Sequence, residues 1–130
     1  MNWLLIAIGG AIGSMARYAS TTYVAPLIFK PTESSVQFPW GTFAVNLLGS
    51  FLIGLLYVVL VEKNNLSPLY KLFFITGLLG GYTTFSAFSL EMLQLWQSGQ
   101  MLNAISYAVG SVVCGLLLAF GGMLFAQKIF

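Results

Sequence analysis

The chain has 130 residues, of which 58% are hydrophobic and only 6% are charged, with a formal net charge of +2. Soluble domains carry about 25% charged residues, so this composition indicates an integral membrane protein. The five basic and three acidic side chains form no basic patch, which argues against nucleic acid as a partner. The chain has no histidine and one cysteine, Cys114, so it lacks the usual ligands of zinc, haem and iron–sulfur groups. For the same reason it offers little for acid–base or nucleophilic catalysis, and we predict that it is not an enzyme.

Four stretches are long and apolar enough to cross a bilayer, which takes about 20 mostly apolar residues. These spans lie at about residues 3–29, 40–61, 69–97 and 101–129. The polar breaks between them are residues 30–39, 62–68 and 98–100. Tryptophans lie near the span ends, as expected of side chains that favour the membrane interface: Trp3, Trp40 and Trp96. We therefore predict an all-α membrane protein in which residues 1–130 form one domain with four transmembrane helices.

The first span carries Gly9 and Gly13, and the third span Gly77 and Gly81, at a small-xxx-small spacing that lets helices approach closely, either within a subunit or between subunits. Arg17 lies near the middle of the long first span. A fixed positive charge at this depth attracts anions into a vestibule. Alternatively, the side chain reaches the headgroups or pairs with a carbonyl, and the sequence leaves both readings open.

The second span contains Asn46, within the run from Gly41 to Gly49. Polar groups inside a bilayer are expensive and are therefore functional candidates. The Asn46 amide can donate two hydrogen bonds to an anion, or it can bond a neighbouring helix. Considered alone, the helix contact is the better interpretation. Together with the polar run in the third span, Asn46 is predicted to line a pathway.

The third span contains the most informative stretch, residues 77–89, which is predicted to break the helix at membrane depth. Gly80 and Gly81, followed by Thr83 and Thr84, lower the helix propensity there. Irregular backbone inside a membrane persists only where it is buried in protein or lines a wet cavity. Because hydroxyl groups surround this break, it is predicted to belong to a pathway or a binding site.

Phe85 and Phe88 lie three residues apart, just after the predicted break. Such a pair usually packs or faces lipid. The positive edges of two rings can also offer weak stabilisation to a small anion in a narrow pore. Glu91 lies on the same helix face and marks either an aqueous mouth or the membrane interface. On the fourth span, Tyr107 and Ser111 share a face, where they continue a polar track or bond between helices.

The charge distribution gives only a weak orientation signal. An even number of spans places both termini and the second loop on one side, with Lys63, Lys71 and Lys128; Lys30 and Arg17 belong to the other. The positive-inside bias is therefore feeble. We expect that copies insert in both orientations and that two opposite copies pair.

Taken together, these segments resemble the small bacterial fluoride channels, the Fluc or CrcB family. Four pieces match in order: the glycine-spaced first span ending in Arg17, the segment from Gly41-Thr42 to Asn46, the run Gly80-Gly81-Tyr-Thr-Thr-Phe-Ser-Ala-Phe-Ser89-Leu-Glu91, and Tyr107 with Ser111. The resemblance covers essentially the whole chain, and the third-span run is its most specific part.

The resemblance implies a passive fluoride-selective channel that exports cytoplasmic fluoride down its electrochemical gradient. It implies an antiparallel, dual-topology dimer with two pores in the bacterial inner (plasma) membrane. The nearly balanced charges favour a homodimer over a pair with a second, oppositely oriented paralogue. The pore residues implied are the phenylalanines Phe85 and Phe88, the amide of Asn46, the track of Ser86, Tyr107 and Ser111, the further polar positions Thr42 and Glu91, and the vestibule arginine Arg17. It also implies a structural sodium ion at the dimer centre, bound by the backbone carbonyls of Gly80 and Thr83. A helix break strands carbonyls, and a hard cation is one of few partners that can satisfy them in lipid.

Two positions depart from the family pattern. Ala87 stands where a threonine is expected, which removes one hydroxyl from the polar track, and Tyr82 replaces an aliphatic residue. Two other functions remain open. A small multidrug-type exporter would want an acid deep in an early span, and the first two spans contain none. A non-transporting scaffold would use the same polar residues only to pair helices.

Overall fold

The structure is a computed structural model in which residues 2–30, 36–62 and 67–130 are described. Within these ranges the chain is helical and contains no strand, as predicted. The first segment comprises α1 (Asn2–Ala19), η1 (Ser20–Val24) and α2 (Ala25–Ile28). The second comprises α3 (Trp40–Tyr57) and η2 (Val58–Glu62). The third comprises α4 (Pro68–Lys71), η3 (Leu72–Leu79), α5 (Gly80–Tyr82) and α6 (Phe85–Gln97), and the fourth is α7 (Met101–Ile129). The segments labelled η are π-helical turns that continue the neighbouring α-helices.

Three of these segments are long and apolar enough to cross a membrane: Trp40–Glu62, Pro68–Gln97 and Met101–Ile129. The first segment is helical from Asn2 to Ile28 but does not join them within the described residues. Its glycines, Arg17 and the Ser20-Thr21-Thr22 run lower its apolar content. The transmembrane helix expected at about residues 3–29, in the first segment, therefore stays a prediction, as does the total of four. The predicted loops at 30–39 and 62–68, with Lys63, lie partly outside the described residues.

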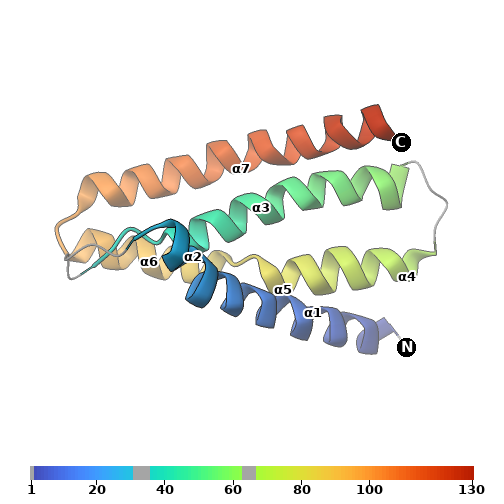
Figure 1. Cartoon of the computed structure of the whole chain (residues 1–130), viewed down its shortest axis with the longest axis horizontal. Helices are drawn as coiled ribbons and strands as arrows, with labels where there is room; N and C mark the ends of the chain where they lie inside the picture. Colours follow the sequence, from blue (N-terminus) through green and yellow to red (C-terminus); the bar gives the residue numbers. More distant parts are fainter. Residues whose placement is uncertain (1, 31–35, 63–66) are drawn as a thin grey trace.

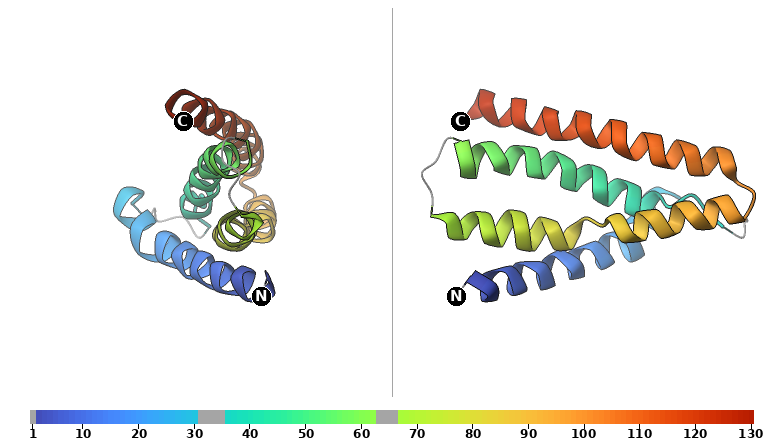
Figure 2. Two further views of the ribbon diagram at one scale, coloured as in Figure 1. Left: turned by 90° about the vertical axis from the view of Figure 1, so that its right-hand side faces the viewer. Right: turned by 180° about the vertical axis from the view of Figure 1, so that it is seen from behind.

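The segments lie side by side in the order α7, α3, third segment and α1 (Figures 1 and 2). Both termini lie at one end of the bundle, together with η2 and α4, which flank the second loop (Figure 1). At the opposite end lie α6 and the start of α7 (Figure 1). This is the arrangement that an even number of crossings predicts.

The third segment changes neighbours along its length. Its first half, η3 and α5, packs along α1, whereas α6 packs against α7. The break between α5 and α6 therefore lets one segment contribute to two different helix pairs (Figure 1).

Glycines hold α1 against the first half of the third segment. A Cβ on Gly13 would collide with the backbone carbonyl of Leu78, and one on Gly81 would lie 2.5 Å from the carbonyl oxygen of Gly10. A Cβ on Gly9 would lie 2.6 Å from the carbonyl oxygen of Phe73. The small-residue pairs of the first and third spans therefore pack against each other within the subunit, the first of the two alternatives that the sequence left open.

Glycines also allow the backbones of α3 and α7 to approach closely. A Cβ on Gly54 would collide with the carbonyl of Ala119, and one on Gly122 would collide with the carbonyl of Phe51. In contrast, Gly121 has open space around it. Backbone thus meets backbone on the side of α7 that carries Gly122, and these two helices cannot be spaced further apart without losing that contact.

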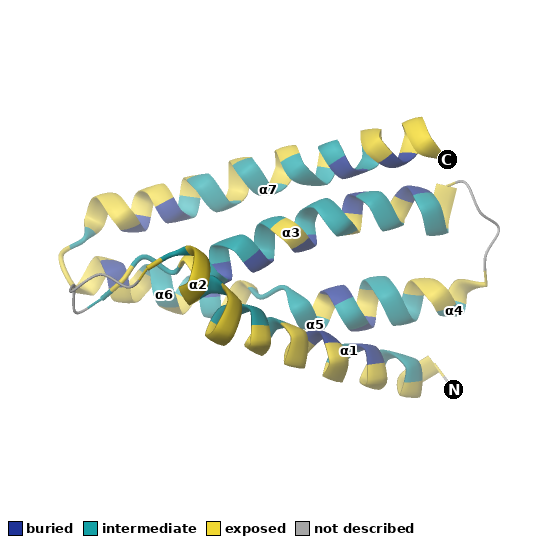
Figure 3. Ribbon diagram, in the orientation of Figure 1, coloured by how far each residue is buried: buried dark blue, intermediate teal, exposed yellow. Residues whose placement is uncertain are grey.

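Among the described residues, few are buried, and these lie on helix faces turned toward a neighbouring helix (Figure 3). One cluster, formed by Phe88, Leu95, Ala104 and Tyr107, joins α6 to α7. The outer faces are apolar and exposed, as Leu116 at 69% illustrates. Polar surface would be expected there if the bundle faced water, so these faces suit a hydrocarbon environment.

Candidate functional site

The third segment breaks at Thr83 and Thr84, both of which have extended backbone dihedral angles. The predicted break is confirmed, but its expected cause is partly wrong. Gly80 and Gly81 are helical residues of α5, where Gly81 is needed for the close approach of α1. The threonines alone leave the helix, and the Thr84 hydroxyl then accepts a 3.3 Å hydrogen bond from the N–H of Ala87 to cap α6.

Asn46 holds this break through both polar groups of its amide. Its Oδ1 accepts a 2.9 Å hydrogen bond from the N–H of Thr84, and its Nδ2 donates a 3.0 Å bond to the Thr84 carbonyl. In a continuous helix that N–H would bond the carbonyl of Gly80. Asn46 therefore bridges helices, which was the alternative reading of this residue, and it retains one N–H for another partner.

Arg17 approaches the same break from α1. Its Nη1 donates a 3.4 Å hydrogen bond to the carbonyl of Thr83. The pairing with a carbonyl, one of the alternatives for this residue, is thus the contact that the structure contains. Nearby, the hydroxyls of Ser20 and Tyr82 lie 3.3 Å apart, so the unusual tyrosine ties α5 to the first segment.

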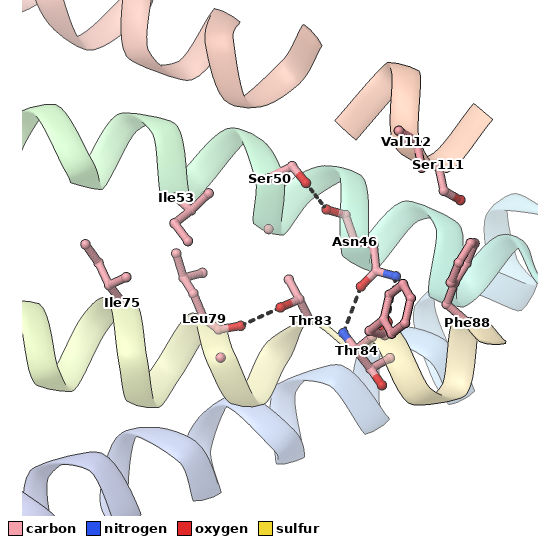
Figure 4. A pocket seen from close by; sticks show the side chains of 13 residues that line it. Asn46, Ser50, Ile53, Ile75, Leu79, Thr83, Thr84, Phe88, Ser111 and Val112 are labelled. Carbon is pink, nitrogen blue, oxygen red and sulfur yellow. Dashed lines mark hydrogen bonds between the residues drawn. The ribbon is translucent and has the colours of Figure 1, made fainter. Parts of the chain in front are cut away.

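A cleft of about 480 Å³ opens between α3, α7 and the two sides of the break (Figure 4). Its lining is polar around the break and aliphatic toward the end of the bundle that carries the termini. The residues that line it are Asn46, Gly49, Ser50, Ile53, Ile75, Leu79, Gly80, Thr83, Thr84, Phe85, Phe88, Ser111 and Val112. The Ser111 Oγ is buried and has no hydrogen-bond partner in the part of the chain that the structure describes.

Phe85 and Phe88 border this cleft but differ in their surroundings. Phe88 is buried and packs on the Tyr107 ring, with centroids 4.9 Å apart. Phe85 is 79% exposed and touches Phe88 with centroids 5.6 Å apart. Phe88 is therefore fixed by packing, whereas Phe85 projects from the subunit at the edge of the cleft.

Glu91 joins three helices through its carboxylate. One oxygen accepts a 2.6 Å hydrogen bond from the Thr42 hydroxyl of α3, and the other accepts a 2.7 Å bond from the Tyr107 hydroxyl of α7. Thr42 and Tyr107 are both buried, so these donors compensate a partly buried charge. Glu91 also lines a second cleft with Gln94, Gln97 and Ser98, at the end of the bundle opposite the termini. Its assignment to an aqueous mouth or to the membrane interface stays a prediction.

The predicted site residues thus form two groups. Asn46, Phe85, Phe88, Ser111, Gly80 and Thr83 line the first cleft, whereas Thr42, Tyr107 and Glu91 form the adjoining hydrogen-bonded group. Arg17 lies outside both groups, at the Thr83 carbonyl. Ser86 is exposed, and its hydroxyl lies 3.4 Å from that of Thr84.

Sequence reasoning missed Ser50, which lines the cleft from α3. Its spacing from Asn46 was the available signal, because residues four apart share a helix face. It also missed the capping role of Thr84. That role depends on where the helix resumes, which the threonine pair alone does not specify.

Comparison with known proteins gives consistent matches along the chain. The family model described as CrcB-like protein, Camphor Resistance (CrcB), matches residues 4–123. A protein named fluoride-specific ion channel FluC from Saccharophagus degradans is 42% identical over 98% of this chain and 90% of its own length. Proteins of the same name from Rhizobium meliloti and Thermus thermophilus are 43% and 47% identical, over 92% and 93% of this chain and 91% and 90% of their own lengths.

Proposed function

The chain belongs to the CrcB-like family, and from that premise we propose that it is a passive fluoride-selective channel of the bacterial inner (plasma) membrane. The observation that carries the proposal is the cleft at the broken third segment, where donors and two aromatic rings meet in an otherwise apolar bundle. Fluoride is strongly hydrated, so a pore must replace its water with hydrogen-bond donors. The relatives that match over nearly their whole length are named for this ion.

Export follows from the membrane potential without any coupled energy source. A potential that is negative inside favours anion exit by about 2.3 kcal/mol per charge per 100 mV. Fluoride therefore leaves the cytoplasm through any selective passage. The sequence has no nucleotide-binding motif, which is consistent with a channel rather than a pump.

In this proposal, Asn46 offers the anion the N–H that its contact with Thr84 leaves over. The orphaned hydroxyl of Ser111 faces the same cleft and supplies a second donor. Phe85 and Phe88 offer their ring edges, which attract anions weakly and so do not trap them. Thr42, Glu91 and Tyr107 continue the track toward the polar mouth, with Ser86 as a further hydroxyl. Arg17 adds a positive charge near the break.

We propose that the working unit is an antiparallel, dual-topology homodimer with two pores. One subunit leaves the polar lining of its cleft open at the side, and Phe85 projects beyond it. Lipid cannot satisfy those polar groups, so they need a second protein surface or a water-filled passage beside them, and a second subunit can form both. The weak charge bias is consistent with opposite insertion of two identical copies.

The proposed structural sodium fits the backbone at the break. The Thr84 N–H bonds Asn46, so the Gly80 carbonyl loses its usual helical donor. The Thr83 carbonyl accepts one long bond from Arg17 and keeps a second lone pair. Carbonyl oxygens suit a hard cation. We propose that Gly80 and Thr83 of both subunits hold the ion, which would fix the break at the dimer centre.

Growth of an export-deficient bacterial host tests the function. The wild-type protein should restore growth in fluoride and should leave sensitivity to cationic drugs unchanged. The variant Phe85→Ala should restore less growth, since it removes a ring at the edge of the cleft. Rescue from cationic drugs without rescue from fluoride would instead identify a multidrug-type exporter, and rescue from neither by a stably expressed protein would favour a scaffold.

A further inference from the structure

Ser50 lies one helical turn beyond Asn46 on α3 and lines the same cleft (Figure 4). Thr42, Asn46 and Ser50 are spaced four residues apart, so they follow one face of the helix. Four residues of α-helix advance by about 6 Å, so successive donors along this face are one turn apart. The next cleft-lining residue of α3 is Ile53, which has no side-chain donor. Ser50 is therefore the last side-chain donor that α3 brings to this cleft.

The hydroxyl of Ser50 can change partners without leaving a buried group unsatisfied. Its Oγ donates a 2.8 Å hydrogen bond to the main-chain carbonyl of Asn46. That carbonyl lies inside α3, where it also faces the N–H four residues later. Rotation of the hydroxyl away from the Asn46 carbonyl thus costs one hydrogen bond, and the carbonyl keeps its helical N–H donor.

On α7, Gly115 faces Ser50 and Ser111 lines the cleft. Gly115 of α7 has no side chain, and a Cβ there would lie 3.4 Å from the Ser50 Oγ. One turn earlier on α7, the buried Oγ of Ser111 lacks a partner in the described part of the chain. Two serine hydroxyls from facing helices therefore border one cleft, and neither is committed to a neighbouring side chain.

We propose that Ser50 is a further residue of the fluoride pathway, whose hydroxyl turns from the Asn46 carbonyl to the anion one turn beyond the Asn46 amide. This inference rests on the proposed channel function. It extends the polar lining from Asn46 to the point where aliphatic side chains begin. An anion that passes Asn46 then meets the Ser50 hydroxyl. The helix fixes the position of this residue, and rotation of its side chain frees the hydroxyl to donate to the anion.

The test is fluoride efflux from liposomes that contain the purified wild-type protein, Ser50→Ala or Ser50→Thr. Loss of the donor should slow efflux about tenfold, the rate equivalent of about 1.4 kcal/mol. Ser50→Thr keeps the hydroxyl and should retain most of the rate. Ser89→Ala is the matched control, since Ser89 makes the same kind of bond, 2.9 Å to the Phe85 carbonyl, but does not line the cleft.

A second pair of variants keeps the test valid if Ser50→Ala does not fold. Ser50→Thr and Ser50→Val differ only by a hydroxyl in place of a methyl group, so slower efflux in the valine variant alone supports the proposal. Equal efflux in this pair, or an equal loss in Ser89→Ala, would overturn it. If the wild-type protein releases no fluoride, the channel function is overturned together with the role of Ser50. If only the comparison of the Ser50 variants fails, the channel function stands.

Discussion

The two halves of this bundle are held together by different forces. Toward the termini, helices meet through glycines, and Gly54 and Gly122 bring the backbones of α3 and α7 into direct contact. Toward the opposite end, side-chain hydrogen bonds of Asn46 and Glu91 join α3 and α7 to the third segment. The glycine half gains dispersion contacts between backbones, whereas the polar half retains side-chain donors for an ion. In this small chain, the glycine half therefore holds the helices together, and the polar half provides the passage for the ion.

The largest effect should follow from filling the glycine contact. Gly122→Leu places a branched side chain where even a Cβ collides with the Phe51 carbonyl. Overpacking commonly costs about 1–3 kcal/mol, and collision with backbone should cost more, so little folded protein is expected. Thermal unfolding in detergent measures this, with Gly121→Leu as the control, because Gly121 has open space. Equal stability of the two variants would contradict the claim that glycine contacts hold this half of the bundle together.

The polar half should fail differently when its clamp is removed. Asn46→Ala leaves the N–H and carbonyl of Thr84 without their partners, and each unsatisfied group costs about 1–3 kcal/mol. Fluoride efflux should fall to background, while the glycine contacts preserve the helical content seen by circular dichroism. Asn103→Ala is the control, since its amide bonds Gln100 at an exposed position. Normal efflux in Asn46→Ala would contradict the role of this cleft.

A moderate effect is expected at the carboxylate that joins three helices. Tyr107→Phe retains the buried ring and removes only the 2.7 Å bond to Glu91. Hydrogen bonds to charged groups contribute about 1.5–3 kcal/mol, so both the melting temperature and fluoride efflux should decrease. Tyr70→Phe, at an exposed position on α4, should change neither. A Tyr107→Phe protein that matches the wild type in both measurements would exclude this bond from the polar track.

The smallest effect should come from the first segment. Arg17→Gln removes a long, 3.4 Å bond to the Thr83 carbonyl, so the loss of stability should be at most about 1 kcal/mol. If the charge also draws anions toward the break, efflux should slow most at low ionic strength, where screening is weak. Arg17→Lys preserves the charge and should retain that salt dependence. The same slowing at all salt concentrations would limit Arg17 to its contact with Thr83.

Sequence reasoning predicted the helical class, the position of the break and the family, because each depends on local composition or on a contiguous run. Hydropathy located three spans that the structure also finds. The run from Gly80 to Glu91 pointed to the break and to the cleft-lining phenylalanines. These features can be recognised in the sequence without knowledge of tertiary contacts.

The remainder depended on partners far apart in the chain. Whether Asn46 binds a helix or an anion was open in the sequence, since its partner Thr84 is 38 residues away. The same holds for Arg17 and the Thr83 carbonyl, which are 66 residues apart. Gly81 was predicted both to break the helix and to allow close helix packing, because low helix propensity accompanies either use. Only the position of α1 decides between these two uses of Gly81.

The most direct test of the account is anion efflux from liposomes that contain the purified wild-type protein, loaded with fluoride or chloride in turn and with sodium present throughout. A channel built on this cleft predicts rapid fluoride release and no chloride release above that of protein-free liposomes. Equal release of both anions, or no fluoride release from a folded and assembled protein, would contradict the assignment of the polar half as a fluoride passage.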